Sequence, residues 1–497
     1  MKNKINTFIQ KNRLFFFIFT VGILITLPSI IPSFNMDAYC TISSNFLSSV
    51  KTFMKSGRIF TAFSYFLAYK MNLSFSIFSI ISIITANLFL SLSIYQLFEY
   101  LKKYVENNLL YQSFLFIGTF LLIYNPLVIE LLLFEEAFIM CLGIYFVVLS
   151  TLNFMKYDKK HLFFSLLLSI FGCICYQGIM CFYIPILFML VVFELKGNIK
   201  KDYIDILKKG IKAILFYGIS LIISFFIVKF INKFIYTDGT EKLGTIHILY
   251  NMRKAIELMF FSLKGMFGFV NKPIFYGSFL SLFLLTIFGN QEKKDDFYWS
   301  KVLYLSINIL LCIGMPFVPN LGMNSAMNYT AARMIVSIGS IIGLTIIYAT
   351  VYFDSISLKN TKKLLILLVT IYSVYNSFNF FYTSYVGLKR YENDMKSIQI
   401  IHEKIKEYEI QYGIKVKTIK YDSKANNYYY EYGITNSYNY RVYATAWAMK
   451  CAINMGKDKY EYIEMTDEEK DTYFGDIKYI EDSQFIFEND TLYLMLY

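Results

Sequence analysis

Charged residues are scarce in this sequence. Only 17% of its 497 residues are Asp, Glu, Lys or Arg, whereas about a quarter is usual for a soluble globular protein. Hydrophobic residues make up 56% and are clustered. Segments such as 14–31 and 334–353 run for about 18 to 20 residues without a charge, which at about 1.5 Å per residue crosses the roughly 30 Å hydrocarbon core of a membrane. A series of such segments separated by polar loops excludes a soluble globular fold and predicts an all-α polytopic membrane bundle.

The sequence also lacks the patterns that bind metals and nucleotides. It has three histidines, and none is paired with another His or a Cys at the spacing of metal ligands. The seven cysteines are scattered and mostly lie in apolar segments, so we expect neither a structural zinc ion nor a disulfide framework. No Gly-rich phosphate-binding loop is present. No cofactor is predicted, although a divalent metal ion stays open. The net charge of +12 lies mostly in short loops, so no nucleic-acid partner is expected.

Lys and Arg are missing from some loops and concentrated in others, which predicts the orientation of the chain. The loops at 125–136, 176–178 and 316–332 contain neither residue, whereas the alternate loops are rich in Lys. Lys and Arg also precede the first apolar segment, so the N-terminus is expected in the cytoplasm. Because that segment is long and lacks a small-x-small cleavage site, we expect an uncleaved anchor rather than a signal peptide.

About eleven membrane-spanning helices account for this alternation of loops. They are expected at residues 14–31, 73–98, 110–124, 137–155, 162–176, 179–195, 212–231, 273–289, 301–315, 334–353 and 364–386. An odd number of spans that starts in the cytoplasm places the C-terminus outside. The membrane domain is therefore predicted to occupy residues 1–387.

The C-terminal residues differ from the rest in composition. From residue 387 on the sequence is acidic, and its patterns predict a small extracytoplasmic α/β domain at 388–497. We expect its helices at 390–412 and 444–455, and its strands at 416–422, 459–464, 478–480 and 491–497. Two earlier outward segments, 32–72 and 232–272, contain apolar stretches too short to span, which predicts helices that lie in the membrane interface.

Acidic residues on the predicted outer side are candidates for catalysis, because ionisable groups at membrane depth are costly. Asp37 follows the first apolar segment, where a carboxylate could take a proton from an incoming hydroxyl group. Glu135 and Glu136 follow the third apolar segment and are flanked by apolar residues, so they could bind a sugar, bind a metal ion or share a proton. The alternatives are a solvated loop residue for Asp37 and an interfacial cap for the glutamate pair.

Basic residues on the same side are candidates for binding a phosphate group. Arg58 lies in the same loop as Asp37, and Arg333 begins the tenth apolar segment, against the cytoplasmic bias of positive charge. A guanidinium group binds phosphate through two parallel donors. Lys264 and Lys272 are further candidates, and a headgroup anchor is the alternative for Arg58. The polar residues expected to contact a sugar or acceptor are Tyr39, Tyr176, Gln177 and Asn320.

The order of these features along the chain forms a pattern. Asp37 and the pair Gly57-Arg58 lie in the first outward loop, Glu135 and Glu136 follow Phe134 after the third span, and Tyr176-Gln177 ends a later span. With the extracytoplasmic C-terminal domain, this order resembles the GtrII-type glucosyltransferases, bacterial membrane enzymes that decorate surface polysaccharides. The resemblance covers most of the membrane domain.

The resemblance implies a GT-C architecture with its active site on the outer face, a polyprenyl-phosphate sugar, often glucose, as donor, and a surface polysaccharide as acceptor. Its first-loop acid corresponds to Asp37 and its arginine to Arg58. The sequence departs from the family in having one acid in that loop rather than two adjacent acids, and Glu135 or Glu136 where Asp is typical. We expect direct inverting displacement with Asp37 as base. Glu135 or Glu136 would orient the sugar, and Arg58 and Arg333 would bind the phosphate.

Two other functions are compatible with a multispan protein. A lipid-linked oligosaccharide flippase or transporter commonly shows internal repeats, and none is evident in this sequence. A polysaccharide polymerase would share the large outward loop at 232–272, but the C-terminal domain is not expected of it.

Overall fold

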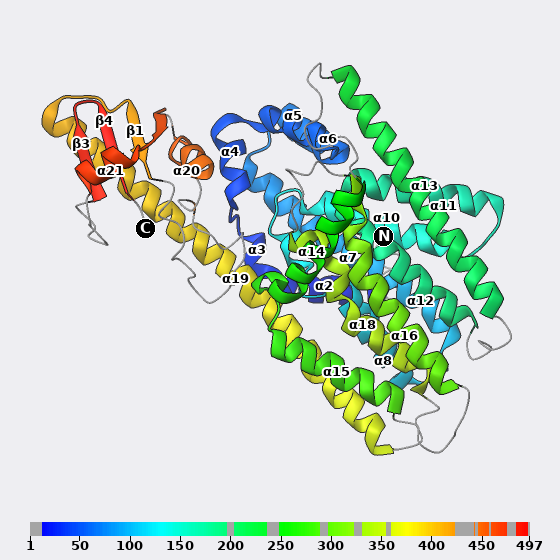
Figure 1. The fold of residues 1–497 in the computed structure, drawn as a ribbon. Coiled ribbons are helices and arrows are strands. Elements are labelled where there is room, and N and C mark those ends of the chain that lie inside the picture. The colour runs from blue at the N-terminus through cyan, green and yellow to red at the C-terminus, as the bar shows by residue number, and fades with distance from the viewer. Residues whose placement is uncertain are drawn as a thin grey trace, which may run out of the picture.

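The computed structural model describes residues 12–195, 203–235, 248–288, 297–322, 331–353, 359–422, 442, 446–456, 459–474 and 484–495 (Figure 1). The apolar helices are α2 (Arg13–Ile25), α7 (Phe75–Leu101), α8 (Leu109–Ile123), α10 (Ala137–Phe154), α11 (Lys159–Cys175), α12 (Tyr183–Leu195), α13 (Tyr203–Ile235), α15 (Lys272–Phe288), α16 (Phe297–Gly314), α18 (Ile341–Val351) and α19 (Lys359–Tyr412). Further helices connect them: α3 (Leu27–Ile30), α4 (Met36–Ser44), α5 (Phe46–Lys55), α6 (Ile59–Lys70), α9 (Ile129–Leu132), α14 (Ile248–Gly265) and α17 (Val336–Gly339). Turns of 3₁₀ helix are η1 (Lys102–Tyr104), η2 (Gln177–Phe182), η3 (Met266–Gly268), η4 (Met315–Phe317), η5 (Pro319–Gly322) and η7 (Ala332–Met334).

Each of the eleven predicted apolar segments is mostly helical in its described residues, and the segment predicted at 334–353 is divided into η7, α17 and α18. Among the described residues, five helices are individually long and apolar enough to cross a membrane. They are Phe75–Tyr104, Ala137–Phe154, Gln177–Leu195, Leu207–Ile231 and Lys359–Tyr412. The chain is therefore a helical protein suited to a lipid bilayer, and the number of about eleven spans stays a prediction.

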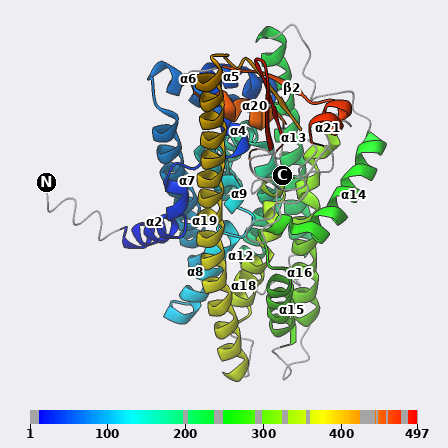
Figure 2. The same cartoon turned by 90° about the vertical axis from the view of Figure 1, so that its left-hand side faces the viewer.

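The two ends of the helical bundle differ in chemistry. At one end the Lys209 ammonium group, near the start of α13, lies 3.0 Å from the Glu194 carboxylate at the end of α12 and 4.7 Å from the centre of the Tyr157 ring after α10. Lys362, near the start of α19, lies 5.0 Å from the centre of the Phe353 ring. We call this the lysine end. The opposite end, to which α19 rises to meet the small sheet, is the domain end (Figure 2). Lys209 and Lys362, from two of the Lys-rich loops, are the described residues that define this end, and the orientation of the bundle stays a prediction.

Three helices of the segment 32–72 lie at the domain end (Figure 1). Asn35 precedes α4 and accepts a hydrogen bond from the Ala38 N–H, and Asn45 precedes α5 and accepts one from the Ser48 N–H. Such capping side chains satisfy backbone donors that have no partner within the helix. The segment 232–272 contains α14 in its described part. Both segments therefore contain helices in their described residues, and their outward position and depth in a membrane stay predictions.

The C-terminal domain is a small mixed α/β unit, as predicted. Its helices are α20 (Ala446–Ile453) and α21 (Asp467–Tyr473), and its strands are β1 (Thr418–Tyr421), β2 (Glu461–Glu464), β3 (Phe485–Glu488) and β4 (Thr491–Leu494). The strand order is β2-β1-β4-β3, with β1 parallel to both neighbours and β3 antiparallel to β4. The predicted strand at 478–480 lies outside the described residues. Neither β3 nor α21 was predicted.

The predicted domain boundary at 387/388 falls inside α19, which continues without a break for 54 residues. Its lower part packs in the core of the bundle, whereas Ile398, Ile401 and Ile405 belong to the core of the C-terminal domain. One helix therefore joins the two hydrophobic cores.

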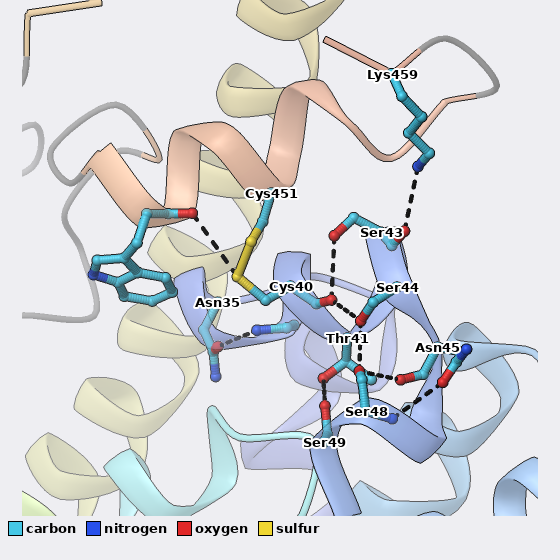
Figure 3. The surroundings of a disulfide bond; sticks show 12 residues. Asn35, Cys40, Thr41, Ser43, Ser44, Asn45, Ser48, Ser49, Cys451 and Lys459 are labelled. Atoms are coloured by element: carbon cyan, nitrogen blue, oxygen red, sulfur yellow. Dashed lines mark hydrogen bonds between the residues drawn. A yellow bond between two sulfur atoms is a disulfide. The ribbon is translucent and has the colours of Figure 1, made fainter. Parts of the chain in front are cut away.

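The expectation of no disulfide is wrong. Cys40 in α4 and Cys451 in α20 form a disulfide bond, with their Cα atoms 4.7 Å apart (Figure 3). The two residues are 411 positions apart in the sequence, so no spacing rule indicates that they pair. The other five cysteines are buried free thiols in the helical bundle, in keeping with the small apolar role expected of them.

Candidate functional site

Three buried carboxyl groups lie in the loop between α8 and α10, at the domain end. Glu130, Glu135 and Glu136 are almost fully buried, and each residue exposes less than 4% of its surface. The loop is fixed by its neighbours: the Asn125 amide donates to the Ser340 hydroxyl group at 3.0 Å, and the Asn376 amide donates to the Tyr124 carbonyl group at 2.7 Å. Buried carboxyl groups require partners, and each of the three has a different one.

Glu130 is paired with Arg333. One oxygen accepts from the Arg333 backbone N–H at 2.6 Å, and the other accepts from Nη1 at 2.8 Å. The guanidinium group also lies 4.5 Å from the centre of the Phe134 ring, and its Nε donates to the Tyr176 hydroxyl group at 3.0 Å. Burial raises the pKa of Glu130 to about 7, and the Arg333 donors oppose that rise. The pair anchors η7 to the carboxylate loop.

Glu136 is paired with Arg58, with 3.2 Å between Oε1 and Nη1. The Arg58 guanidinium group lies 4.9 Å from the centre of the Tyr176 ring, within the range of a cation–π contact. Tyr176 therefore lies between the two arginines, with its ring against Arg58 and its hydroxyl group bound to Arg333. Burial raises the pKa of Glu136 and Arg58 opposes that rise.

Two glycines allow these segments to approach closely. Gly57 has a φ of +77°, and a Cβ at this position would lie 3.0 Å from Nε2 of Gln177. A Cβ on Gly178 would lie 3.1 Å from Cα of Met334. Gln177, predicted to bind the sugar or acceptor, thus lies beside the turn that carries Arg58, and Gly178 lets η2 approach η7.

Glu135 is held by Asn35 rather than by an arginine. The Asn35 backbone N–H donates to Oε1 at 3.4 Å, and its side-chain amide donates to Oε2 at 3.3 Å. Burial and the neighbouring Glu136 carboxylate raise the pKa of Glu135 well above its usual value. Both effects favour the neutral form of Glu135 over its ionised form.

Asp37 lies two residues after Asn35, in the first turn of α4, and its side chain is exposed. Its charge raises the pKa of both Glu135 and Glu136, and the charges of Arg58 and Arg333 lower that of Glu136. These groups, which are far apart in the sequence, therefore share one electrostatic environment at the domain end. We call Asp37, Arg58, Glu130, Glu135, Glu136, Tyr176 and Arg333 the carboxylate–arginine cluster.

Three members of the site were not proposed from the sequence as site residues. Glu130 and Asn35 each bind a predicted residue, but only the fold shows these pairings. Tyr65 in α6 is almost fully buried, and burial, then the charges of Glu136 and Glu135, raise the pKa of its hydroxyl group. Tyrosine is so frequent in this sequence that no single Tyr stands out.

The remaining predicted residues are Lys264, Lys272, Tyr39 and Asn320. Lys264 at the end of α14 and Lys272 at the start of α15 have exposed side chains, and no ion pair joins them to the cluster within the described part of the chain. Tyr39, a residue of α4, is fully buried against the C-terminal domain. Its hydroxyl group has no hydrogen-bond partner among the described residues. Asn320 lies in η5, and its side chain falls outside the described residues.

A cavity of about 370 Å³ opens beside α4. Its wall combines polar and aromatic side chains from α4, α5, α6 and the start of α7: Thr41, Asn45, Phe46, Tyr69, Asn72 and Phe75. Thr41 lies one helical turn after Asp37 and so on the same face of α4. We call this the polar cavity.

A second cavity, of about 290 Å³, is almost entirely apolar and lies between α12, α13 and α16. Ile184, Leu187, Ile214 and Leu311 are among the residues that line it, with Lys209 at the lysine end. We call it the apolar cavity. Its lining is suited to a hydrocarbon chain.

Within the described residues, no group of three or more His, Cys, Asp or Glu side chains is arranged to hold a metal ion. The divalent ion that the sequence left open therefore has no ligand set in that part of the chain. The chemistry available at the cluster is that of carboxylates, guanidinium groups and a phenol.

No protein-family model, no curated protein and no solved structure matches this chain.

Proposed function

We propose that this protein is a membrane glycosyltransferase. It moves a hexose, expected to be glucose, from a polyprenyl phosphate to a surface glycan at the outer face of a bacterial plasma membrane, by direct inverting displacement. The observation that carries the proposal is the carboxylate–arginine cluster. An exposed carboxylate, Asp37, shares one electrostatic environment with Arg58, which is incompletely buried.

The orientation of the bundle supports an outer-face reaction. The lysine end is expected in the cytoplasm, because Lys-rich loops are retained there. The domain end, with the cluster, is then extracytoplasmic. The disulfide between Cys40 and Cys451 agrees with this orientation, because disulfides persist in oxidising compartments and are rare in the cytosol.

The contacts within the cluster favour Asp37 as the base. Glu136 is occupied by Arg58, and Glu135 is bound through both oxygens by Asn35 with its neutral form favoured. Asp37 lies in the first turn of α4 with an exposed side chain that no arginine or asparagine occupies among the described residues. An accessible carboxylate is what an acceptor hydroxyl group needs.

In the proposed reaction the acceptor oxygen attacks the anomeric carbon from the side opposite the phosphate. The bond between that carbon and the phosphate oxygen breaks, the polyprenyl phosphate leaves with the bonding electrons, and the acceptor proton passes to Asp37. Arg58 stabilises the negative charge on the leaving phosphate. Arg333 binds Glu130 and Tyr176, so we assign it a positioning role behind Arg58.

The two cavities suggest where the rest of each substrate would lie. The polar cavity offers amide, hydroxyl and aromatic groups, the side chains that bind sugars, and it adjoins the face of α4 that carries Asp37. The apolar cavity is suited to part of an isoprenoid chain. We propose the polar cavity for the acceptor and the apolar cavity for the donor tail.

The proposal is tested with purified protein in proteoliposomes that contain a radiolabelled polyprenyl-phosphate glucose and a surface-glycan acceptor. Wild-type protein should transfer label to the acceptor. Asp37→Asn should lower the rate by about 10²–10⁴-fold, the usual contribution of a general base. Asp471→Asn, a change at an exposed carboxylate in α21, is the matched control and should retain full activity.

Two outcomes would contradict the proposal. A fully active Asp37→Asn enzyme would remove the assignment of the base. Movement of labelled donor across the bilayer without transfer to any acceptor would favour a flippase instead.

A further inference from the structure

The helix that carries Asp37 packs against the C-terminal domain. Figure 3 shows α4 beside α20, with Cys40 facing Cys451. Ala38 and Tyr39 of α4 lie in the same hydrophobic core as Met449 of α20, Ile401 of α19 and Leu492 of β4. The two residues that follow Asp37 are therefore buried against the C-terminal domain, which is far away in the sequence.

Polar and covalent contacts hold the same segment. Arg390 of α19 is almost fully buried, and its Nη2 donates to the Phe34 carbonyl group at 2.8 Å. The disulfide joins Cys40, one turn after Asp37, to Cys451. Near the end of α4, the Lys459 ammonium group donates to the Ser43 carbonyl group at 3.3 Å (Figure 3). The C-terminal domain thus contacts this segment before, within and near the end of α4.

The opposite side of the segment contacts the carboxylate loop. Asn35, next to Phe34, caps α4 and donates two hydrogen bonds to Glu135. The stretch from residue 34 to residue 40 is therefore fixed between two bodies, the carboxylate loop on one side and the C-terminal domain on the other. Asp37 lies in the middle of this stretch, and its exposed side chain has no hydrogen bond of its own among the described residues.

We infer that the C-terminal domain positions Asp37, and that Cys40, Cys451 and Arg390 are the residues through which it does so. Because Asp37 is not held by a hydrogen bond of its own side chain, its place relative to Arg58 and Glu136 is set by the position of α4. The inference about turnover rests on the proposed transferase function, whereas the inference about the position of Asp37 does not.

A domain that only stabilises the fold would give a different result from one that positions Asp37. Loss of a purely stabilising disulfide would lower the unfolding temperature but leave kcat and the environment of Asp37 unchanged in molecules that stay folded. Loss of a positioning contact would lower kcat at temperatures well below unfolding, with little change in KM for the donor.

The test uses the full-length protein in proteoliposomes and the double variant Cys40→Ser/Cys451→Ser. The accessibility of Asp37 is measured by carbodiimide labelling and mass spectrometry of the peptide that contains it, which requires no activity. We expect the labelling rate of Asp37 to change at least threefold and kcat to fall about tenfold, with donor KM within a factor of two. Arg390→Met should act in the same direction, and Arg390→Lys should restore part of the effect.

Two controls separate positioning from general damage. Glu469→Gln removes the ion pair between Glu469 and Lys420 inside the C-terminal domain and does not touch α4, so it should change neither quantity. Dithiothreitol, whose two thiols become a cyclic disulfide as Cys40 and Cys451 become thiols, should reproduce the double variant in wild-type protein and have no effect on the double variant.

The outcomes are distinct. If the labelling of Asp37 and kcat are both unchanged in the double variant and in Arg390→Met, the inference is overturned. If the labelling changes in the folded protein while wild-type protein transfers no sugar, the positioning holds and the proposed function fails.

Discussion

The two arginine–glutamate pairs of the cluster are chemically alike but differ in depth. The side chains of Arg333 and Glu130 are 8% and 0% exposed, whereas those of Arg58 and Glu136 are 16% and 4% exposed. Both arginines contact Tyr176, one at its hydroxyl group and the other at its ring. The deeper pair joins η7 to the carboxylate loop, and the shallower pair lies on the side of Asp37. Depth therefore separates a pair that is closed to solvent from a pair that, in the proposed function, contacts the substrate.

The largest effect is expected where the deeper pair is broken. Arg333→Met leaves Glu130 buried without its cation, which should destabilise the protein by about 3–5 kcal/mol. The measurement is the apparent unfolding temperature and the yield of folded protein in detergent. The double variant Arg333→Met/Glu130→Gln removes both charges and should recover more than half of the lost stability, because no uncompensated charge remains. Equal stability of the single and double variants would contradict the role given to this pair.

The shallower pair should affect turnover more than stability. Arg58→Gln is expected to lower kcat about 100-fold, because the charge on the leaving phosphate loses its cation. The unfolding temperature should change little, since Arg58 is incompletely buried. Arg58→Lys keeps the charge but not the planar contact with Tyr176, so an intermediate rate is expected. Proteoliposome kinetics beside thermal unfolding measure both quantities, and a stability loss as large as that of Arg333→Met would erase the distinction between the pairs.

Both pairs contact Tyr176, so the contributions of its hydroxyl group and of its ring can be tested separately. Tyr176→Phe removes the hydroxyl group that accepts from Arg333 and keeps the ring beneath Arg58. It should cost about 1.5–3 kcal/mol of stability, typical of a hydrogen bond to a charged group, with a modest effect on kcat. Tyr176→Leu also removes the cation–π contact and should lower kcat further. If both variants have the same kcat, the ring contact does not position Arg58.

Glu135 extends the comparison to a carboxyl group that is bound by an asparagine. Burial and Glu136 raise its pKa, so the neutral form is favoured in the folded protein. The stability that this group contributes is complete below its unfolded pKa of about 4.3 and is lost as the pH rises through the raised pKa of the folded state. Glu135→Gln cannot ionise, so its unfolding temperature should fall less than that of wild-type protein as the pH rises above about 4.3. Parallel slopes for the two proteins would show that Glu135 does not titrate in this range.

The sequence could indicate which residues form the cluster because charge is rare in it. Asp37, Arg58, Glu136 and Arg333 are ionisable residues on the predicted outer side, and the fold brings them to one end of the bundle. The alternation of Lys-rich and Lys-free loops predicts at which end of the bundle each loop lies. It does not give the position of a helix around the bundle, and no ion pair joins Lys264 or Lys272 to the cluster among the described residues.

The pairings themselves could not be predicted. Arg333 and Glu130 are 203 positions apart, Asn35 and Glu135 are 100 apart, and Cys40 and Cys451 are 411 apart. Each pairing depends on how helices pack, and a single sequence carries no record of packing between distant segments. The continuity of α19 was also missed, because its apolar half predicts a membrane span and its charged half predicts a soluble helix.

The unbroken α19 has a mechanical consequence. A helix of 54 residues is about 80 Å long at about 1.5 Å per residue, whereas the hydrocarbon core of a bilayer is about 30 Å thick. The helix therefore runs as one continuous element from the lysine end of the bundle to the core of the C-terminal domain. A tilt of about 5° at the lysine end would displace the far end by about 7 Å if nothing restrained it, given that length. The disulfide between α4 and α20 and the hydrogen bond from Arg390 of α19 to the Phe34 carbonyl group restrain that far end against the segment that holds Asp37.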